Sequence, residues 1–229
     1  MRDKGVLNLT GNAYTATLLR RACETNRTSR EVIEATRHLY QYLVYQMVRS
    51  YFPREEGVYK TNMGAPCRGP FLARSTEVVI VTLARAGIIP AQVCQDMLSV
   101  LLPARNVRQD FYMMTRVRTE EGFEARCGGW KSGGPVAGSI VVIPDPMGAT
   151  GTSMRAVLRR IAEVEEESGK AHEVVVLCMV TAPEFYHALA KERDGVVVFT
   201  TRMDEGLDEK GYIIPGMGDA GDLIYNSKP

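Results

Sequence analysis

Four short runs rich in valine and isoleucine constrain the fold more than any other feature of this sequence. They are EVVIVTL (77–83), SIVVIP (139–144), EVVVLCMV (173–180) and GVVVFT (195–200). Continuous apolar runs of this length are typical of parallel strands that are buried on both faces. Helical patterns lie between the runs, at roughly 89–102, 152–167 and 183–193. Strand and helix in alternation predict an α/β fold, with a mostly parallel sheet flanked by helices.

The regions outside this alternation predict additions to the sheet. Thr28 and Glu31 form a capping-box pattern at the start of a long amphipathic helix. Residues 53–76 are rich in Pro and Gly and predict loops or short strands, and residues 105–138 predict a projecting hairpin with a Gly-rich turn. The Gly-rich segment 203–225 leaves no room for a long regular element.

Length and charge narrow the class of protein. A chain of 229 residues predicts a single domain over 1–229, with a core at about 72–201, a C-terminal segment at 202–229 and a helical N-terminal segment at 1–52. Lys and Arg number 28 against 27 acidic residues, which argues against nucleic-acid coating or attachment to an anionic membrane. The apolar runs are too short to span a bilayer, and the N-terminus lacks the pattern of a signal peptide. Five scattered cysteines predict reduced thiols and a cytoplasmic location.

The stretch DPMGATGTSM after the second apolar run has the composition of a phosphate-binding loop. Ligands of parallel sheets bind at the carboxyl ends of the strands, where Asp145 is expected. Small residues let backbone N–H groups approach a phosphate at the start of the next helix, and the hydroxyls of Thr150, Thr152 and Ser153 add donors. A carboxylate before such a loop suits sugar hydroxyls. The alternative interpretation is an ordinary well-capped turn between strand and helix.

Several sequence segments resemble motifs of one protein family. VVIPDPMGATGTS (141–153) resembles the phosphoribosyl pyrophosphate (PRPP) motif of type I phosphoribosyltransferases, and Pro146 indicates the uracil phosphoribosyltransferase branch. The segment MDEGLDEKGYIIPGMGDAGD is similar to the uracil-binding segment of that branch. ARAG (84–87) and VRTEEGFEA (117–125) resemble the family's pyrophosphate loop and its Arg-x-Glu-Glu stretch. The resemblance implies the type I fold, with N-terminal helices, a projecting hairpin and a C-terminal hood over the base.

The resemblance also implies roles for individual residues. Asp145 would bind the ribose hydroxyls, Arg85 and Arg118 would contact pyrophosphate, and Asp219 would lie beside both base and PRPP. Arg116 is a rival to Arg118. Asp145, Arg118 and Asp219 are the expected catalytic residues. Pro146 would also bind PRPP, and the 5-phosphate would be held by Met147, Gly148, Ala149, Thr150, Gly151, Thr152 and Ser153. The base edge would be read by Ile213, Gly218, Asp219 and Ala220.

Several positions depart from the family pattern. Ile88, Ile89 and Pro90 replace Leu-Gly-Met after the Arg-Ala-Gly loop, which predicts a stiffer loop. Gly148 stands for a usual Leu and Thr152 for a usual Gly. If position 152 requires a positive φ, Thr152 is strained. Two further departures are Leu223, where a basic residue is common, and RCGGWKSGGPVAG (126–138).

Other conspicuous residues have simpler interpretations. Trp130 is either the anchor of a loop or a lid over the site. Segment 163–170, EVEEESGK, predicts a solvated helix end. His38, His172 and His187 show no metal-ligand spacing.

The implied reaction is transfer of the phosphoribosyl group from PRPP to uracil, giving UMP and pyrophosphate. Mg²⁺ would be the cofactor, held mainly through PRPP and not by a dedicated protein site, and the family implies a homodimer or larger homo-oligomer. The first alternative is a phosphoribosyltransferase for another base. The second is a non-catalytic sensor of PRPP or UMP that binds RNA, for which a modest basic cluster is available: Arg105, Arg108, Arg116, Arg118 and Arg126.

Overall fold

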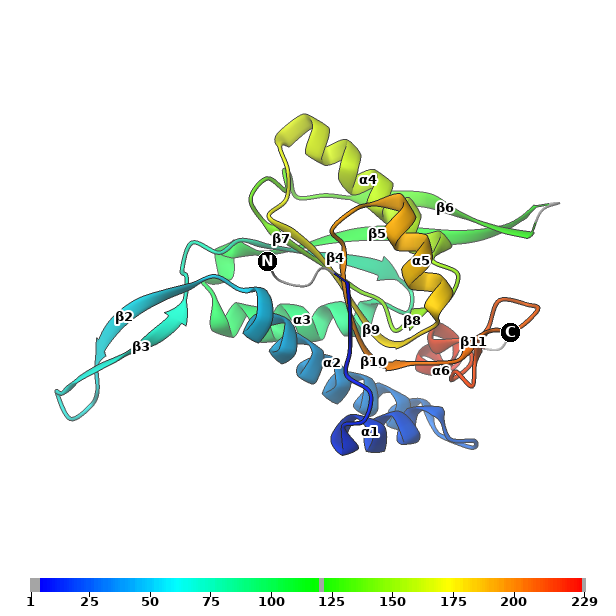
Figure 1. Cartoon of the computed structure of the whole chain (residues 1–229), viewed down its shortest axis with the longest axis horizontal. Coiled ribbons are helices and arrows are strands. Elements are labelled where there is room, and N and C mark those ends of the chain that lie inside the picture. The colour runs from blue at the N-terminus through cyan, green and yellow to red at the C-terminus, as the bar shows by residue number, and fades with distance from the viewer. Residues whose placement is uncertain (1–4, 120–121, 228–229) are drawn as a thin grey trace.

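The computed structural model describes residues 5–119 and 122–227, and over 115–119 and 122–127 it describes the backbone alone. Its main sheet has the order β1-β10-β9-β7-β4-β5-β6, with β8 paired to β9 (Figure 1). The strands are β1 (Val6–Asn8), β4 (Val78–Ala84), β5 (Val107–Thr119), β6 (Gly122–Lys131), β7 (Ile140–Pro144), β8 (Met147–Gly148), β9 (Glu173–Thr181) and β10 (Val197–Met203). Within the described residues β5 and β6 are antiparallel and the other neighbours are parallel. The predicted mostly parallel sheet is confirmed, and the four apolar runs are β4, β7, β9 and β10.

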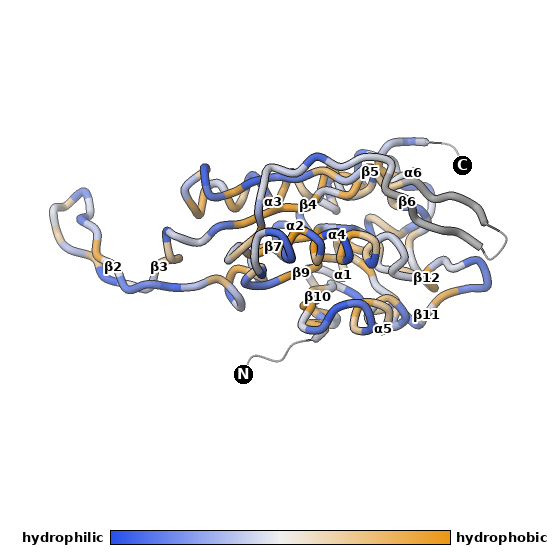
Figure 2. The backbone as a smooth tube through the Cα atoms, turned by 90° about the horizontal axis from the view of Figure 1, so that it is seen from above, coloured by the Kyte–Doolittle hydropathy of each residue, from blue (hydrophilic) through white to orange (hydrophobic). Residues whose placement is uncertain are grey.

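Helices cover both faces of this sheet. α2 (Ser29–Tyr51) and α3 (Ile88–Leu101) lie on one face, and α4 (Thr152–Ser168) and α5 (Pro183–Glu192) lie on the other (Figure 1). Successive side chains of a strand point to opposite faces, so each strand supplies two cores. On β7, Val142 packs in the α2–α3 core while Val141 packs in the α4–α5 core. Because both faces are covered, the strands are apolar without alternation, and they form the orange centre of Figure 2.

The N-terminal helices begin where the sequence predicts. α1 (Ala13–Cys23) is capped by the Asn12 side chain. Thr28 accepts a hydrogen bond from the Glu31 backbone N–H, and the Glu31 carboxylate accepts one from the Thr28 N–H. The capping box is thus confirmed. The buried face of α2 includes the predicted residues, which are Val32, Ala35, Leu39, Leu43 and Met47.

Two hairpins project from the body of the protein. β2 (Arg54–Lys60) and β3 (Pro66–Leu72) form a separate antiparallel pair that extends away from the main sheet (Figures 1 and 2). The short strands expected within 53–76 are therefore present. The long β5–β6 hairpin confirms the hairpin expected within 105–138. A short 3₁₀ turn, Ala104–Asn106, leads into β5.

The C-terminal segment consists of short pieces, as its glycines predict. β11 (Gly206–Leu207) pairs with β12 (Ile213–Ile214), and α6 (Ala220–Tyr225) follows. We call residues 204–227 the hood. None of the helices in the described ranges combines the length and the hydrophobicity needed to cross a bilayer.

Two predictions about single features are now decided. Trp130 is half-buried, stacks edge-on against Tyr112 with 4.7 Å between ring centroids, and lies 4.5 Å from the Arg160 guanidinium, so it is an anchor and not a lid. The prediction of a solvated helix end at 163–170 is wrong for Glu165. This side chain is buried because Arg193, 28 residues along the chain, pairs with both of its carboxylate oxygens at 2.6 and 2.8 Å.

Candidate functional site

The loop from Asp145 to Ser153 lies at the carboxyl end of β7 and is fixed to β9. The Asp145 N–H donates to the Leu177 carbonyl at 3.0 Å, and the Pro146 carbonyl accepts from Met179 and Val180 at 3.1 Å each. The Tyr40 hydroxyl of α2 donates to the same Leu177 carbonyl at 2.9 Å. Asp145 is therefore held in place from the sheet and from the helical layer beneath it.

The start of α4 offers the donors that a phosphate needs. Gly151 precedes the helix with φ +79° and, as a glycine, has no side chain to cap it. The Thr150 hydroxyl lies 2.9 Å from that of Thr152 and accepts a long hydrogen bond, 3.4 Å, from the Thr152 N–H. A helix N-terminus with adjacent hydroxyls is suited to bind an anion. Gly151 supplies the positive φ and Thr152 is already helical, so the condition for strain at Thr152 is not met.

Gly148 has a packing explanation. A Cβ at this position would lie 2.7 Å from a Phe185 ring carbon and 2.8 Å from the Thr181 methyl. Phe185, buried at the start of α5, thus fills the space that a side chain at 148 would need. The absence of the usual Leu is compensated from α5.

The loop that is expected to bind pyrophosphate, residues 84–87, follows β4. The Ala84–Arg85 peptide is cis, and Gly87 packs so closely that a Cβ would lie 2.7 Å from the Leu83 carbonyl oxygen and 2.8 Å from that of Pro144. Pro90 lies in the first turn of α3, where the missing N–H removes no helical hydrogen bond. The departure at 88–90 therefore forms the start of a regular helix.

Arg85 connects this loop to the hood. Its guanidinium donates to the Ser227 hydroxyl at 2.7 Å and to the Asp222 carboxylate at 2.9 Å. Asp222 and Ser227 are residues that the sequence analysis did not single out. The available signal for Asp222 was its place as the second acid of the DAGD stretch.

The hood carries the residues expected to read the base. Asp219 caps α6 by accepting from the Asp222 N–H at 3.1 Å, Ile213 is buried in β12, and Gly218 has φ +85°. A Cβ on Gly211 would lie 3.4 Å from the Thr150 methyl. The hood therefore reaches the phosphate loop from across the sheet edge.

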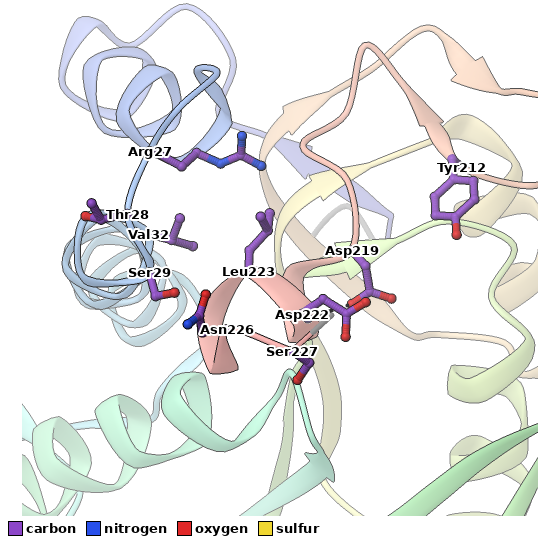
Figure 3. A pocket seen from close by; sticks show the side chains of 10 residues that line it. All are labelled: Arg27, Thr28, Ser29, Val32, Tyr212, Asp219, Asp222, Leu223, Asn226 and Ser227. Atoms are coloured by element: carbon purple, nitrogen blue, oxygen red, sulfur yellow. Dashed lines mark hydrogen bonds between the residues drawn. The ribbon is translucent and has the colours of Figure 1, made fainter. Parts of the chain in front are cut away.

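A cavity of about 660 Å³ lies between the start of α2 and α6. Asp219 and Asp222 extend from the start of α6 on the side of Tyr212 (Figure 3). Asp145 and the loop of residues 146–153, here called the phosphate loop, do not line this cavity. The loop comes near the hood where Thr150 faces Gly211. The lining residues are Arg27, Thr28, Ser29, Val32, Tyr212, Asp219, Asp222, Leu223, Asn226 and Ser227.

Arg116 and Arg118 both lie on β5, opposite Ala125 and Phe123 of β6. Their side chains fall outside the described part of the structure, so the choice between them stays open. Among the described residues, no group of three His, Cys, Asp or Glu side chains is placed to hold a metal ion.

A loop of small and hydroxyl residues at the carboxyl edge of a doubly covered parallel sheet, with a hood that reaches it, is the arrangement of the type I phosphoribosyltransferase fold. The family described as uracil phosphoribosyltransferase matches residues 13–227. The chain therefore belongs to the uracil phosphoribosyltransferase family, which confirms the family expected from the sequence.

Individual relatives agree with this assignment. The uracil phosphoribosyltransferase of Nostoc sp. is 30% identical over 196 residues, covering 84% of each chain. That of Acinetobacter baylyi is 36% identical over 151 residues, covering 66% of this chain and 65% of the relative. Among solved structures, the AQ2163 protein from Aquifex aeolicus superposes with a TM-score of 0.80 at 27% identity, covering 96% of this chain and 97% of the other.

Proposed function

We propose that this protein transfers the phosphoribosyl group of PRPP to N1 of uracil, producing UMP and pyrophosphate. The observation that carries the proposal is the meeting of the phosphate loop and the hood at one sheet edge, where Gly211 lies beside Thr150. Family membership over residues 13–227 supports the same activity.

The residues take the following roles in this proposal. Asp145 accepts hydrogen bonds from the ribose hydroxyls, and residues 147–153 bind the 5-phosphate through the amides and hydroxyls at the start of α4. Arg85 and Arg118 bind pyrophosphate. Catalysis then consists mainly of positioning and of charge stabilisation as the bond to pyrophosphate breaks.

Recognition of uracil falls to the backbone of the hood. Ile213, Gly218 and Ala220 present backbone groups to the base edge, and Asp219 orients the base or accepts its N1 proton. Uracil alternates acceptor, donor and acceptor along O2, N3–H and O4. A backbone carbonyl that accepts a hydrogen bond from N3–H of uracil would face a lone pair on N3 of cytosine. Two acceptors facing each other in a site without water would strongly favour uracil over cytosine.

The donor set fits a Mg²⁺ ion that arrives with the substrate. Mg²⁺ binds oxygen ligands and keeps several waters. It would be held mainly through PRPP, with the Asp145 carboxylate contacting the ribose. Bound Mg²⁺ would neutralise charge on the departing pyrophosphate.

A homo-oligomer is part of the proposal. The β2–β3 hairpin projects as an isolated pair of strands, and such a pair is marginally stable by itself. It exposes large apolar side chains, namely Val58, Tyr59, Met63 and Phe71. Burial of this hairpin against a second copy of the chain would account for both features.

The RNA-binding alternative is weakened by one contact. Arg108, a member of the basic cluster, is bound to Asp110 at 3.0 Å and to the carbonyls of Gly134 and Pro135 at 2.9 Å each. Its guanidinium is therefore engaged inside the protein. RNA affinity that falls steeply with salt, without turnover, would favour the regulator.

The decisive test is incubation of the pure protein with PRPP, Mg²⁺ and uracil, with UMP as the readout. A panel of other bases separates uracil transfer from transfer to another heterocycle. Absence of UMP together with turnover of a different base would overturn the assignment to uracil.

Comparison of Arg118→Ala with Arg116→Ala tests which of these two arginines binds pyrophosphate. We expect the larger rise in KM for PRPP with Arg118→Ala.

A further inference from the structure

An ion pair with a buried carboxylate lies where β10 passes into the hood. Arg202, near the end of β10, donates from Nη2 to Asp204 Oδ2 at 2.9 Å, and its Nε donates to the other carboxylate oxygen. The Asp204 side chain is 2% exposed. Neither residue was singled out from the sequence, because an Arg-x-Asp spacing carries no signal of its own.

Both members of this pair bind the same residue of the base-reading segment. Asp204 Oδ2 accepts from the Gly216 N–H at 2.8 Å, and Arg202 Nη2 donates to the Gly216 carbonyl at 3.2 Å. Gly216 lies between Ile213 and Gly218, whose backbone groups are expected to read the base. The ion pair thus fixes the N–H and the C=O of one peptide segment at once.

The two hydrogen bonds from the ion pair are made to Gly216, a glycine in a backbone conformation that other residues rarely adopt. Its φ is +59°, and a Cβ would lie 2.1 Å from the Ile213 carbonyl oxygen, so the chain turns tightly here. Arg27 holds the next residue by donating to the Met217 carbonyl at 2.8 Å. Residues 213–218 are therefore held from two sides, by β10 and by the segment that joins α1 to α2.

We propose that Arg202 and Asp204 are positioning residues for base recognition, which hold residues 213–218 in the conformation that binds the pyrimidine edge. This inference rests on the proposed function of the same site. A buried ion pair by itself is weak evidence for stability, because removing two charges from water offsets most of their attraction. Fixed hydrogen-bonding geometry at a binding edge, in contrast, contributes directly to affinity and selectivity.

The test compares Arg202→Met with a matched control, Arg193→Met. Arg193 also forms a paired contact with a buried carboxylate, that of Glu165, which joins the ends of α4 and α5 and takes no part in the site. We expect Arg202→Met to raise KM for uracil by about tenfold or more, with KM for PRPP within about twofold, since misplacement affects only the base edge. Arg193→Met should leave both KM values within about twofold of wild type.

Two further measurements separate positioning from general destabilisation. Amide hydrogen exchange over 213–218 should accelerate in Arg202→Met and stay unchanged in Arg193→Met. Arg202→Lys keeps the charge but lacks the planar fork, so its KM for uracil should lie between those of wild type and Arg202→Met. If Arg202→Met does not fold, Arg202→Lys carries the comparison.

The proposal is overturned if KM for uracil stays within about twofold of wild type, if KM for PRPP rises in the same proportion, or if Arg193→Met has the same effect. Failure of the underlying activity is distinct, since wild type would then make no UMP. In that case, unchanged hydrogen exchange over 213–218 in Arg202→Met overturns the positioning role.

Discussion

Asp145 directly follows strand β7, is half-buried, and donates its backbone N–H to the Leu177 carbonyl. The pKa of the Cys178 thiol is raised well above its ordinary value by burial, and further by the charge of Asp145. The hydrogen bond to Leu177 anchors the backbone of Asp145 to β9. An anchored acceptor suits the proposed binding of two ribose hydroxyls, because its position is set before the sugar arrives.

The first prediction concerns this charge. Asp145→Asn keeps the side-chain volume and removes the charged acceptor, so we expect turnover to fall by about a hundredfold or more while the unfolding temperature stays close to that of wild type. UMP formation and thermal unfolding check the two parts. Asp96→Asn, at an exposed acid on α3, is the control. Wild-type rates in Asp145→Asn would remove the ribose-binding role.

The second prediction concerns Arg85. Charge-assisted hydrogen bonds to phosphate contribute about 1.5–3 kcal/mol, so Arg85→Met should raise KM for PRPP by about tenfold or more. Arg37→Met, at an exposed position of α2, should leave it unchanged. If Arg85→Met lowers only the unfolding temperature, the role of Arg85 is its pairing with Asp222 and not substrate binding.

For single residues, the sequence predicts where functional side chains lie along the chain better than it predicts which residues they contact. The motif around Asp145 indicates a phosphate loop because small residues, hydroxyls and one acid have local meanings. The Arg85–Asp222 pair joins residues 137 positions apart, and the Arg202–Gly216 contact depends on a tight turn of the hood. Contacts of this kind depend on the path of the chain, which no local pattern encodes.

Among the elements, those with a strong local cause are predictable. Strands β4, β7, β9 and β10 follow from doubly buried apolar runs, and the start of α2 follows from its capping box. The β2–β3 hairpin could be expected only as loops or short strands, because its Pro and Gly residues give a mixed signal. β1 has three residues and depends on pairing with β10, so it was not predicted.

The third prediction tests how α5 supports the phosphate loop. Gly148→Ala would place a methyl group against Phe185 and Thr181, and overpacking of this kind costs about 1–3 kcal/mol. We expect a lower free energy of unfolding in urea, together with a weaker affinity for PRPP. Gly129→Ala, at a position of β6 where a Cβ meets nothing within 4 Å, is the control. Equal stability of the two variants would contradict the explanation given for Gly148.

Across the whole molecule, Glu165 joins parts of the chain that local patterns treat as separate. Its segment predicts a solvated helix end because it is rich in charge, yet Arg193 at the end of α5 and the Ala171 N–H bind its carboxylate. Burial alone would raise the pKa of Glu165, but these hydrogen bonds lower it to about 2. The pair ties the C-terminal end of α4 to the C-terminal end of α5.

The fourth prediction follows from the sign of this shift. The folded pKa of Glu165, about 2, lies below the unfolded value of 4.5, so its contribution is fully present above about pH 4.5 and is lost as the pH falls toward 2. A shift of this size corresponds to about 3 kcal/mol. Glu165→Gln should therefore have a lower free energy of unfolding than wild type at pH 7, and the difference should shrink steadily as the pH falls from 4.5. Urea unfolding at a series of pH values measures both proteins. A difference that stays constant through this window would show that Glu165 stabilises the helices by packing and not by its charge.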